Sequence, residues 1–227
     1  MDAGQILHEL TYSEGLPKEA LKAASAQRVE MLPLFVEEIE TYLALEPAGR
    51  AKPTPLFFIF HLLGEWGEKT AYRPLARLLR LPRGDVDAIF GDGITTTSHR
   101  VMAAVFDGDL QPLYDIILDP NAEEFIRAGM CEALAMVTVR GELDRAVAGR
   151  FLRDAFTEMR PQAECYVWVG WQSAIAMLGS PIPMTPLTRP ASKNVPTVIA
   201  TSEISMRHHA EIRVLQQSAI CEAIMRA

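Results

Sequence analysis

Three consecutive stretches of the chain each pair two apolar segments around a short glycine-containing turn, and this repetition constrains the fold more than any other feature. Apolar residues recur at spacings of three and four, the period of an α-helix, and the alternating pattern of β-strands is not found. The sequence therefore predicts an all-α protein. The paired segments are residues 55–66 with 71–81, 95–106 with 110–119, and 122–139 with 144–156.

The spacing of the pairs indicates how they are arranged. The second segments begin near residues 71, 110 and 144, which are 39 and 34 residues apart, close to the roughly 40-residue period of HEAT-type repeats. A helical hairpin buries only one face by itself, so each pair must stack on its neighbours. The apolar residues Phe57, Phe58 and Ile59 show that the first helix is apolar nearly all round, as such stacking requires. We predict a HEAT-like α-solenoid of antiparallel helix pairs.

The flanking segments extend the same pattern. Residues 166–179 read as a helix that begins a fourth pair, and residues 29–45 read as a long helix before the first pair. Two shorter helices, near residues 3–12 and 17–26, would cap the stack. Residues 1–179 are thus expected to form one HEAT-like helical repeat domain.

The composition changes after Gly179. Residues 1–179 carry 17 Lys and Arg against 26 Asp and Glu, whereas residues 180–227 carry 5 against 3. Five prolines fall within residues 181–196. We interpret residues 180–201 as a Pro-rich linker or an aberrant segment, and residues 202–227 as a helix that docks elsewhere or as the product of a reading-frame shift. Translating the other two frames downstream of codon 179 would distinguish the two accounts.

Charge and targeting signals exclude several classes of protein. The net charge of −7 and the isoelectric point near 5.3 disfavour a nucleic-acid partner, because a phosphate backbone would be repelled. The N-terminus lacks a basic region before an apolar core, and no apolar run approaches the roughly 18 residues of a membrane span. Cys131, Cys165 and Cys221 are odd in number and form no CxxC pair. A cytoplasmic protein without disulfides, zinc or a membrane partner is expected.

Two acidic, glycine-rich turns are the most conspicuous short motifs. In "VFDGDLQ", Gly108 can supply a left-handed turn and Asp109 can cap the next helix. In "FGDGITTT", Gly91 and Gly93 bracket a similar turn. Neither motif matches a calcium loop or a phosphate loop. We interpret both as hinges between helices.

The alternative is an enzyme or a metal- or ligand-binding protein with a site at these turns. Its residues would be Asp92, His99, Asp107 and Asp109, with the threonines of residues 95–97 beside them. No GxSxG elbow is present, and Cys131 and Cys165 lie in apolar helical runs. The sequence therefore favours a protein that is not an enzyme and implies no cofactor.

Two side-chain groups are candidates for binding a partner. Arg73, Arg77 and Arg80 recur at i, i+4 and i+7 on one helix face, which could bind carboxylates or could be a solvated face paired with local acids. Trp168 and Trp171 share a face of the last helix, where they would either anchor an interface or fill the core. If that face were uncovered, it would allow the chain to form a homo-oligomer.

Four blocks, in this order, resemble a known family: "LLGEWGEKTAYRPLARLLRLP", "GDGITTTSHRVMAAVFDGD", "AEEFIRAGMCEALAMVTVRGEL" and "VWVGWQSAIAMLG". They are similar to the bacterial domain-of-unknown-function family 1186, which is related to HEAT-like repeats, over about residues 30–179. The resemblance implies a helical-repeat fold and no established activity. Some relatives continue into a cysteine-rich zinc-binding tail, which this sequence lacks, so the resemblance implies no zinc here.

These observations together predict a function. Extended helical repeats present long binding surfaces, so we expect a cytoplasmic, non-catalytic scaffold that binds another protein through its concave surface or its acidic edge. The enzyme or ligand-binding alternative at Asp92, His99, Asp107 and Asp109 stays open.

Overall fold

The computed structural model describes residues 1–91, 93–163 and 165–179 of the 227-residue chain. Within these ranges every regular element is an α-helix or a short 3₁₀-helix, and no strand occurs. The all-α prediction is therefore confirmed for the described chain. The segments 180–201 and 202–227, for which we predicted a linker and a helix, lie outside the described residues.

The helices follow one another closely along the chain. The N-terminal half contains α1 (Ala3–Tyr12), α2 (Lys18–Ala26), α3 (Arg28–Ala44), η1 (Pro47–Ala51), α4 (Leu56–Trp66), η2 (Lys69–Ala71), α5 (Tyr72–Leu78) and α6 (Arg83–Phe90). The remainder contains α7 (Gly93–Thr96), α8 (Ser98–Ala104), α9 (Gln111–Leu118), α10 (Glu124–Val139), α11 (Arg145–Glu158) and α12 (Val167–Leu178).

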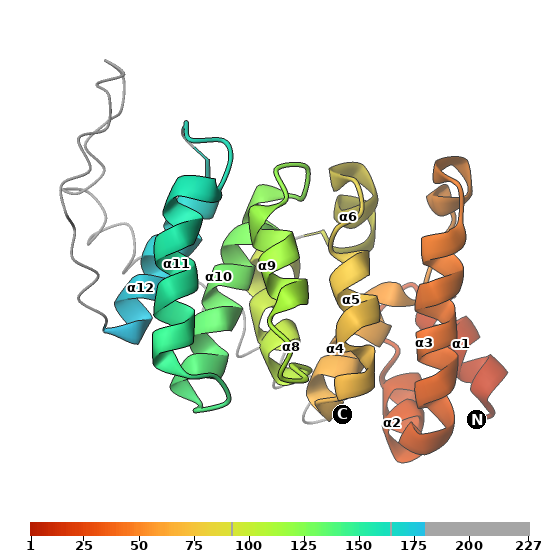
Figure 1. Ribbon diagram of the computed structural model, residues 1–227. Helices are drawn as coiled ribbons and strands as arrows, with labels where there is room; N and C mark the ends of the chain where they lie inside the picture. The colour runs from red at the N-terminus through yellow and green to blue at the C-terminus, as the bar shows by residue number, and fades with distance from the viewer. Residues whose placement is uncertain (92, 164, 180–227) are drawn as a thin grey trace. The chain divides into compact units, whose positions relative to one another are not determined.

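The longer helices lie in two rows (Figure 1). Towards the viewer stand α3, α5, α9 and α11, and behind them stand α4, α8, α10 and α12. In the front row α3 packs on α5 and α5 on α9, and in the back row α4 packs on α8, α8 on α10, and α10 on α12. The helices of the back row are the more apolar ones. Each of them packs against two or more other helices, so much of its surface is buried. In α4, for example, Leu56, Ile59, Phe60, Leu62 and Leu63 are all buried.

The helix that we predicted over residues 71–81 is shorter in the structure than in the prediction. The helix expected over residues 71–81 ends at Leu78, and α6 follows it over a stretch that we had not assigned. Pro82 disfavours helical geometry in the residue before it, so the chain turns and restarts. Helix α6 then buries Val86, Ile89 and Phe90. That i, i+3, i+4 spacing is the signal that would have predicted it.

A second difference lies in the helix expected over residues 95–106. It is divided into α7 and α8 at Thr97, whose backbone leaves helical geometry at φ −127° and ψ −22°. The Thr97 hydroxyl is 2.9 Å from the Gly93 carbonyl and 2.9 Å from His61 Nε2. Hydroxyl contacts of this kind compete with regular helix hydrogen bonds. The division thus depends on a contact with α4.

Two glycines let back-row helices approach closely. A Cβ atom on Gly64 in α4 would lie 2.8 Å from a methyl carbon of Val101 in α8. A Cβ atom on Gly170 in α12 would lie 2.6 Å from the Ala128 carbonyl carbon in α10 and nearer still to its oxygen. Since backbone atoms cannot move aside as a flexible side chain can, α12 can take its position only with glycine at residue 170.

A helix that crosses a bilayer must be both long and apolar. In residues 1–91, 93–163 and 165–179, no helix combines the length and the apolar character needed to cross a membrane.

Candidate functional site

The turn between α8 and α9 contains both aspartates of the second acidic motif. Gly108 has φ +101°, a conformation that favours glycine. The Asp107 carboxylate accepts a hydrogen bond from the Asp109 amide at 2.8 Å, and the Asp109 carboxylate accepts one from the Gln111 amide at 3.0 Å. Both side chains therefore satisfy backbone groups of the turn and of the first turn of α9, as the hinge interpretation expected.

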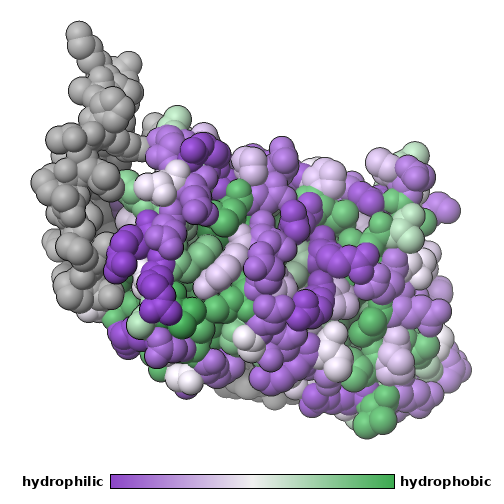
Figure 2. Space-filling model, in the orientation of Figure 1, coloured by the Kyte–Doolittle hydropathy of each residue, from purple (hydrophilic) through white to green (hydrophobic). Residues whose placement is uncertain are grey.

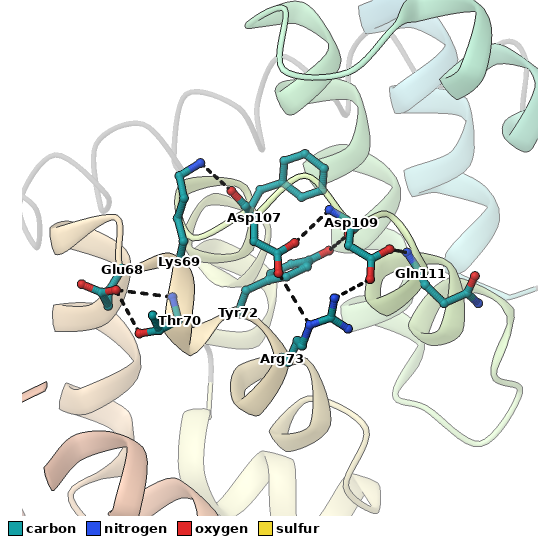
Figure 3. A network of polar contacts seen from close by, with 9 residues as sticks. Glu68, Lys69, Thr70, Tyr72, Arg73, Asp107, Asp109 and Gln111 are labelled. Atoms are coloured by element: carbon teal, nitrogen blue, oxygen red, sulfur yellow. Dashed lines mark hydrogen bonds and ion pairs between the residues drawn. The ribbon is translucent and has the colours of Figure 1, made fainter. Parts of the chain in front are cut away.

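The preceding helix pair holds this turn in place (Figure 3). Arg73 Nη2 lies 2.6 Å from a carboxylate oxygen of Asp109, and Arg73 Nε lies 3.7 Å from one of Asp107. The Tyr72 hydroxyl donates a hydrogen bond to the Asp109 carbonyl at 3.0 Å, and Lys69 Nζ donates one to the Phe106 carbonyl at 2.8 Å. The acidic turn is thus part of the contact between the α5 segment and the turn from α8 to α9.

The electrostatics of the turn agree with that role. The hydrogen bond from the Gln111 amide, followed by the one from Arg73, lowers the pKa of Asp109 below its usual value. Burial, and then the charges of Asp107 and Asp109, raise the pKa of Tyr72 above its usual value. At neutral pH Asp109 is therefore an ionised partner of Arg73, and Tyr72 is a neutral hydrogen-bond donor.

Arg77 of α5 and Arg80, which lies just after this helix, also have acidic partners in neighbouring segments. Arg77 Nη1 donates to both carboxylate oxygens of Glu40 in α3 at 2.8 Å. Arg80 Nη2 lies 3.0 Å from a carboxylate oxygen of Asp119, and Arg80 Nη1 lies 3.8 Å from one of Asp115. The predicted arginine face is therefore real, and each guanidinium already pairs with acids of the same chain.

The sequence contains a signal for these pairs that we did not use. Arg73 and Asp109 are 36 positions apart, Arg77 and Glu40 are 37 apart, and Arg80 and Asp119 are 39 apart. Each separation is close to one repeat. A search for acids one period before or after each arginine would have found the partners.

The residues of the candidate metal or ligand site contact different groups. His99 in α8 has Nδ1 3.9 Å from a carboxylate oxygen of Glu132 in α10, whereas Asp107 and Asp109 contact Arg73. Asp92 lies outside the described residues. Within the described parts of the chain, no three His, Cys, Asp or Glu side chains are grouped so that they could hold a metal ion.

His61 lies beside Thr97, and both nitrogen atoms of its ring contact groups of the protein. Its Nδ1 lies 2.7 Å from the Phe57 carbonyl and its Nε2 lies 2.9 Å from the Thr97 hydroxyl. Burial lowers the pKa of His61, although the bond to Phe57 opposes this. The imidazole is therefore neutral at pH 7 and joins α4 to the α7–α8 junction.

The two cysteines in the described chain are poor nucleophiles. Burial raises the pKa of Cys131 to about 12, and burial also raises the pKa of Cys165. The Cys165 thiol lies 3.4 Å from a carboxylate oxygen of Glu124 and donates to it. Because the reactive form of cysteine is the thiolate, neither residue is activated for covalent chemistry at neutral pH.

The two tryptophans of α12 differ in their surroundings. Trp171 is 7% exposed, and its indole N–H donates to the Leu152 carbonyl in α11 at 2.7 Å. Trp168 is half-buried, and its indole N–H donates to the Pro161 carbonyl at 3.2 Å. Both rings contact Phe156. Trp171 thus fills the contact between α11 and α12, and Trp168 reaches the surface at its edge.

Sequence reasoning did not single out a group of side chains on α9 and α11. Tyr114 of α9 stacks on Phe151 of α11, with ring centroids 3.5 Å apart and an interplanar angle of 5°. Arg150 and Arg153 of α11 are exposed, and Arg150 is near enough for its charge to act on Tyr114. The i, i+3 spacing of the arginines was visible in the sequence, but the stack joins residues 37 positions apart and was not.

The structure therefore defines an all-α protein whose candidate reactive groups serve as contacts between successive helices. The chain belongs to the family described as "Protein of unknown function (DUF1186)", which matches residues 1–195. The family resemblance drawn from the sequence is confirmed, and the match extends beyond residues 30–179 at both ends. The two accounts of residues 180–227 stay as predictions.

Two relatives from Chlamydia are similar to most of this chain. It is 23% identical over 211 residues to an uncharacterized protein of Chlamydia trachomatis serovar D, which covers 91% of this chain and 82% of the relative. It is also 23% identical over 183 residues to an uncharacterized protein of Chlamydia muridarum, which covers 78% of this chain and 72% of the relative. No solved structure matches significantly.

Proposed function

We propose that this protein is a non-catalytic scaffold, a HEAT-like α-solenoid of antiparallel helix pairs that binds another protein in the cytoplasm. Residues 1–179 form its repeat domain. The binding face is the front row of α3, α5, α9 and α11, of which α5, α9 and α11 are the second helices of their pairs. The repeated spacing of the pairs and the contacts along each row support this proposal.

One observation carries the proposal. Of the polar groups best suited to chemistry, Asp107 and Asp109 bind backbone amides and Arg73, and His61 binds Phe57 and Thr97. An active site needs groups that are free to meet a substrate, whereas these groups hold helices together. We therefore assign the function to the exposed surface of the front row, as a surface that binds a partner.

Affinity capture tests the proposal. The full-length chain, immobilised through a terminal tag, is incubated with lysate of its native host, and the bound proteins are identified. We expect one protein in near-stoichiometric amount that then binds the purified chain in isothermal titration calorimetry. If no protein does so, the scaffold proposal is wrong.

The enzyme or ligand-binding alternative has its own test. A ligand that binds only the folded state raises the melting temperature. The chain is heated with Mg²⁺, Ca²⁺, Mn²⁺ or Zn²⁺, and Asp107→Asn serves as the comparison. An increase for one cation that is lost in the variant would favour the alternative at Asp92, His99, Asp107 and Asp109 over the scaffold.

A further inference from the structure

The front-row helices α5 and α11 both carry exposed arginines, but within the described part of the chain only those of α5, Arg73 and Arg77, have acidic partners. Arg150 and Arg153 of α11 are exposed and form no ion pair or hydrogen bond within the described residues. Asp154 lies one turn after Arg150 and makes no ion pair with it within those same residues. Both guanidinium groups therefore present their hydrogen-bond donors to solvent.

An aromatic surface lies near Arg150, and Arg153 follows Arg150 by one helical turn on α11. Tyr114 and Phe151 are half-buried and stacked, so a ring edge from each of α9 and α11 stays accessible. Burial raises the pKa of the Tyr114 hydroxyl, and the charge of Arg150 opposes this shift. Arg150 is thus close to the phenol. Figure 2 shows apolar surface between the polar surfaces over α9 and α11.

The combination is typical of protein interfaces. Tyrosine and arginine are the residue types most enriched among those that dominate binding energy, because they supply large contact areas with directed hydrogen bonds. A guanidinium also binds a carboxylate through two parallel hydrogen bonds. The α9–α11 surface, defined by Tyr114, Arg150, Phe151 and Arg153, therefore suits a partner with carboxylates and an apolar side chain.

We infer that the α9–α11 surface binds an acidic linear segment of the partner protein. This inference rests on the proposed scaffold function. Arginines at i and i+3 on a helix have Cβ atoms about 5–6 Å apart, and alternate side chains of an extended chain are about 6.6–6.8 Å apart. Two acidic residues at alternate positions can thus meet Arg150 and Arg153. An apolar residue next to them then contacts the edges of Tyr114 and Phe151.

The surrounding charges argue against a long polyanion. Asp154 and Glu158 lie on the same helix as the two arginines, and the whole chain has a net charge of −7. A nucleic acid would meet these acids with its next phosphates. A short acidic peptide segment needs only the two guanidinium groups and therefore meets fewer of these acids than a polyanion does.

Selection from a peptide library tests the inference. A phage-displayed library of random peptides is selected on the immobilised full-length chain, and the enriched peptides are synthesised with a fluorescent label. We expect Asp or Glu at alternate positions beside an apolar residue. Enrichment of peptides without acidic residues, or of none, would show that the inference is wrong.

Charge reversal then locates the binding site. Fluorescence polarisation is measured with Arg150→Glu/Arg153→Glu and with Arg100→Glu, which reverses an exposed arginine of α8 that has no ion pair within the described residues. The double variant should weaken the selected peptide at least about tenfold, and the control less than about twofold. Tyr114→Phe keeps the ring and should weaken binding less than about threefold. Circular dichroism checks that each variant is folded.

The remaining outcomes separate this inference from the scaffold proposal. If the double variant still captures the protein found in host lysate, and binds the peptide as tightly as the wild type, the α9–α11 surface is not the site and the scaffold proposal stands. If the wild type captures no protein, the scaffold proposal itself fails. Equal, arginine-dependent binding of single-stranded DNA would show that the surface binds any anion, contrary to the inference.

Discussion

Helices α5 and α11 stand in the same row of the structure and both carry exposed arginines, yet they use them differently (Figure 1). On α5, Arg77 pairs with Glu40 earlier in the chain, and Arg73 pairs with Asp109 later in the chain. On α11, Arg150 and Arg153 have no such partner within the described residues. The contacts of α11 are instead aromatic, through Phe151 and through Trp171 of α12.

This difference separates two roles of one residue type. An arginine whose guanidinium pairs with a neighbouring helix contributes to the junction between repeats and has little capacity left for a partner. An arginine without that pair contributes little to folding and keeps its donors for binding. In the front row, the arginines of α5 are thus paired with acids of the same chain, whereas Arg150 and Arg153 of α11 have no acidic partner within the described residues. Four predictions test this comparison, from the largest expected effect to the smallest.

The strongest test concerns the apolar packing at the α12 end. Gly170→Ala places a Cβ atom against the backbone of Ala128, which cannot shift without moving α10. We expect the free energy of unfolding to fall by about 3 kcal/mol or more, measured by urea denaturation. Gly84→Ala is the matched control, because nothing lies within 4 Å of its new Cβ atom, and it should change stability by less than about 1 kcal/mol. Equal effects would mean that the α10–α12 contact does not depend on glycine.

The aromatic contact between α9 and α11 comes next. Tyr114→Ala removes a half-buried ring stacked on Phe151, so the free energy of unfolding should fall by about 2 kcal/mol. Tyr12→Ala, at a ring that is 60% exposed, should cost less than about 0.5 kcal/mol. Denaturation curves of both variants decide whether the stack holds the front row together at α11.

A direct comparison of the two arginine groups should show a smaller effect. Arg77→Ala removes the two hydrogen bonds to Glu40 and should lower the free energy of unfolding by at most about 1 kcal/mol, less at high salt. Arg150→Ala should leave stability within about 0.5 kcal/mol of the wild type at any salt concentration. A larger loss for Arg150→Ala than for Arg77→Ala would contradict the comparison.

The smallest effect should appear in the pH dependence at the α5 end. Because the pKa of Asp109 is lowered in the fold, its contribution to stability is complete above its unfolded pKa of about 3.8. The contribution is lost as the pH falls through the lower folded value. Asp109→Asn should therefore unfold with a weaker pH dependence below about pH 4 than the wild type. Urea midpoints between pH 2.5 and pH 7 measure this, and an unchanged slope would exclude the role of Asp109.

Several local features could be predicted from the sequence. The helices over residues 29–45, 110–119 and 122–139 begin and end within two residues of their predicted bounds, because their apolar spacing is regular. The turn at Gly108 was predicted because glycine and aspartate have strong local preferences there. Helix α6 was missed, since Pro82 and Gly84 obscured a short buried face.

The candidate sites were less predictable. The sequence left open whether Arg73, Arg77 and Arg80 bind a partner or local acids, and the ion pairs to Glu40, Asp109 and Asp119 were found only in the structure. Likewise, Trp171 could have been an interface residue until its bond to the Leu152 carbonyl placed it in the core. Both questions concern contacts between different helices.

The sequence by itself determined the all-α class, the positions of most helices, the hinges and the family, because these depend on residues three or four positions apart and on the preferences of single residues. Only the tertiary structure decided which arginines are paired, which aromatic rings stack and where Thr97 divides a helix. Those contacts join residues 36–39 positions apart, which become neighbours only when the helices pack side by side.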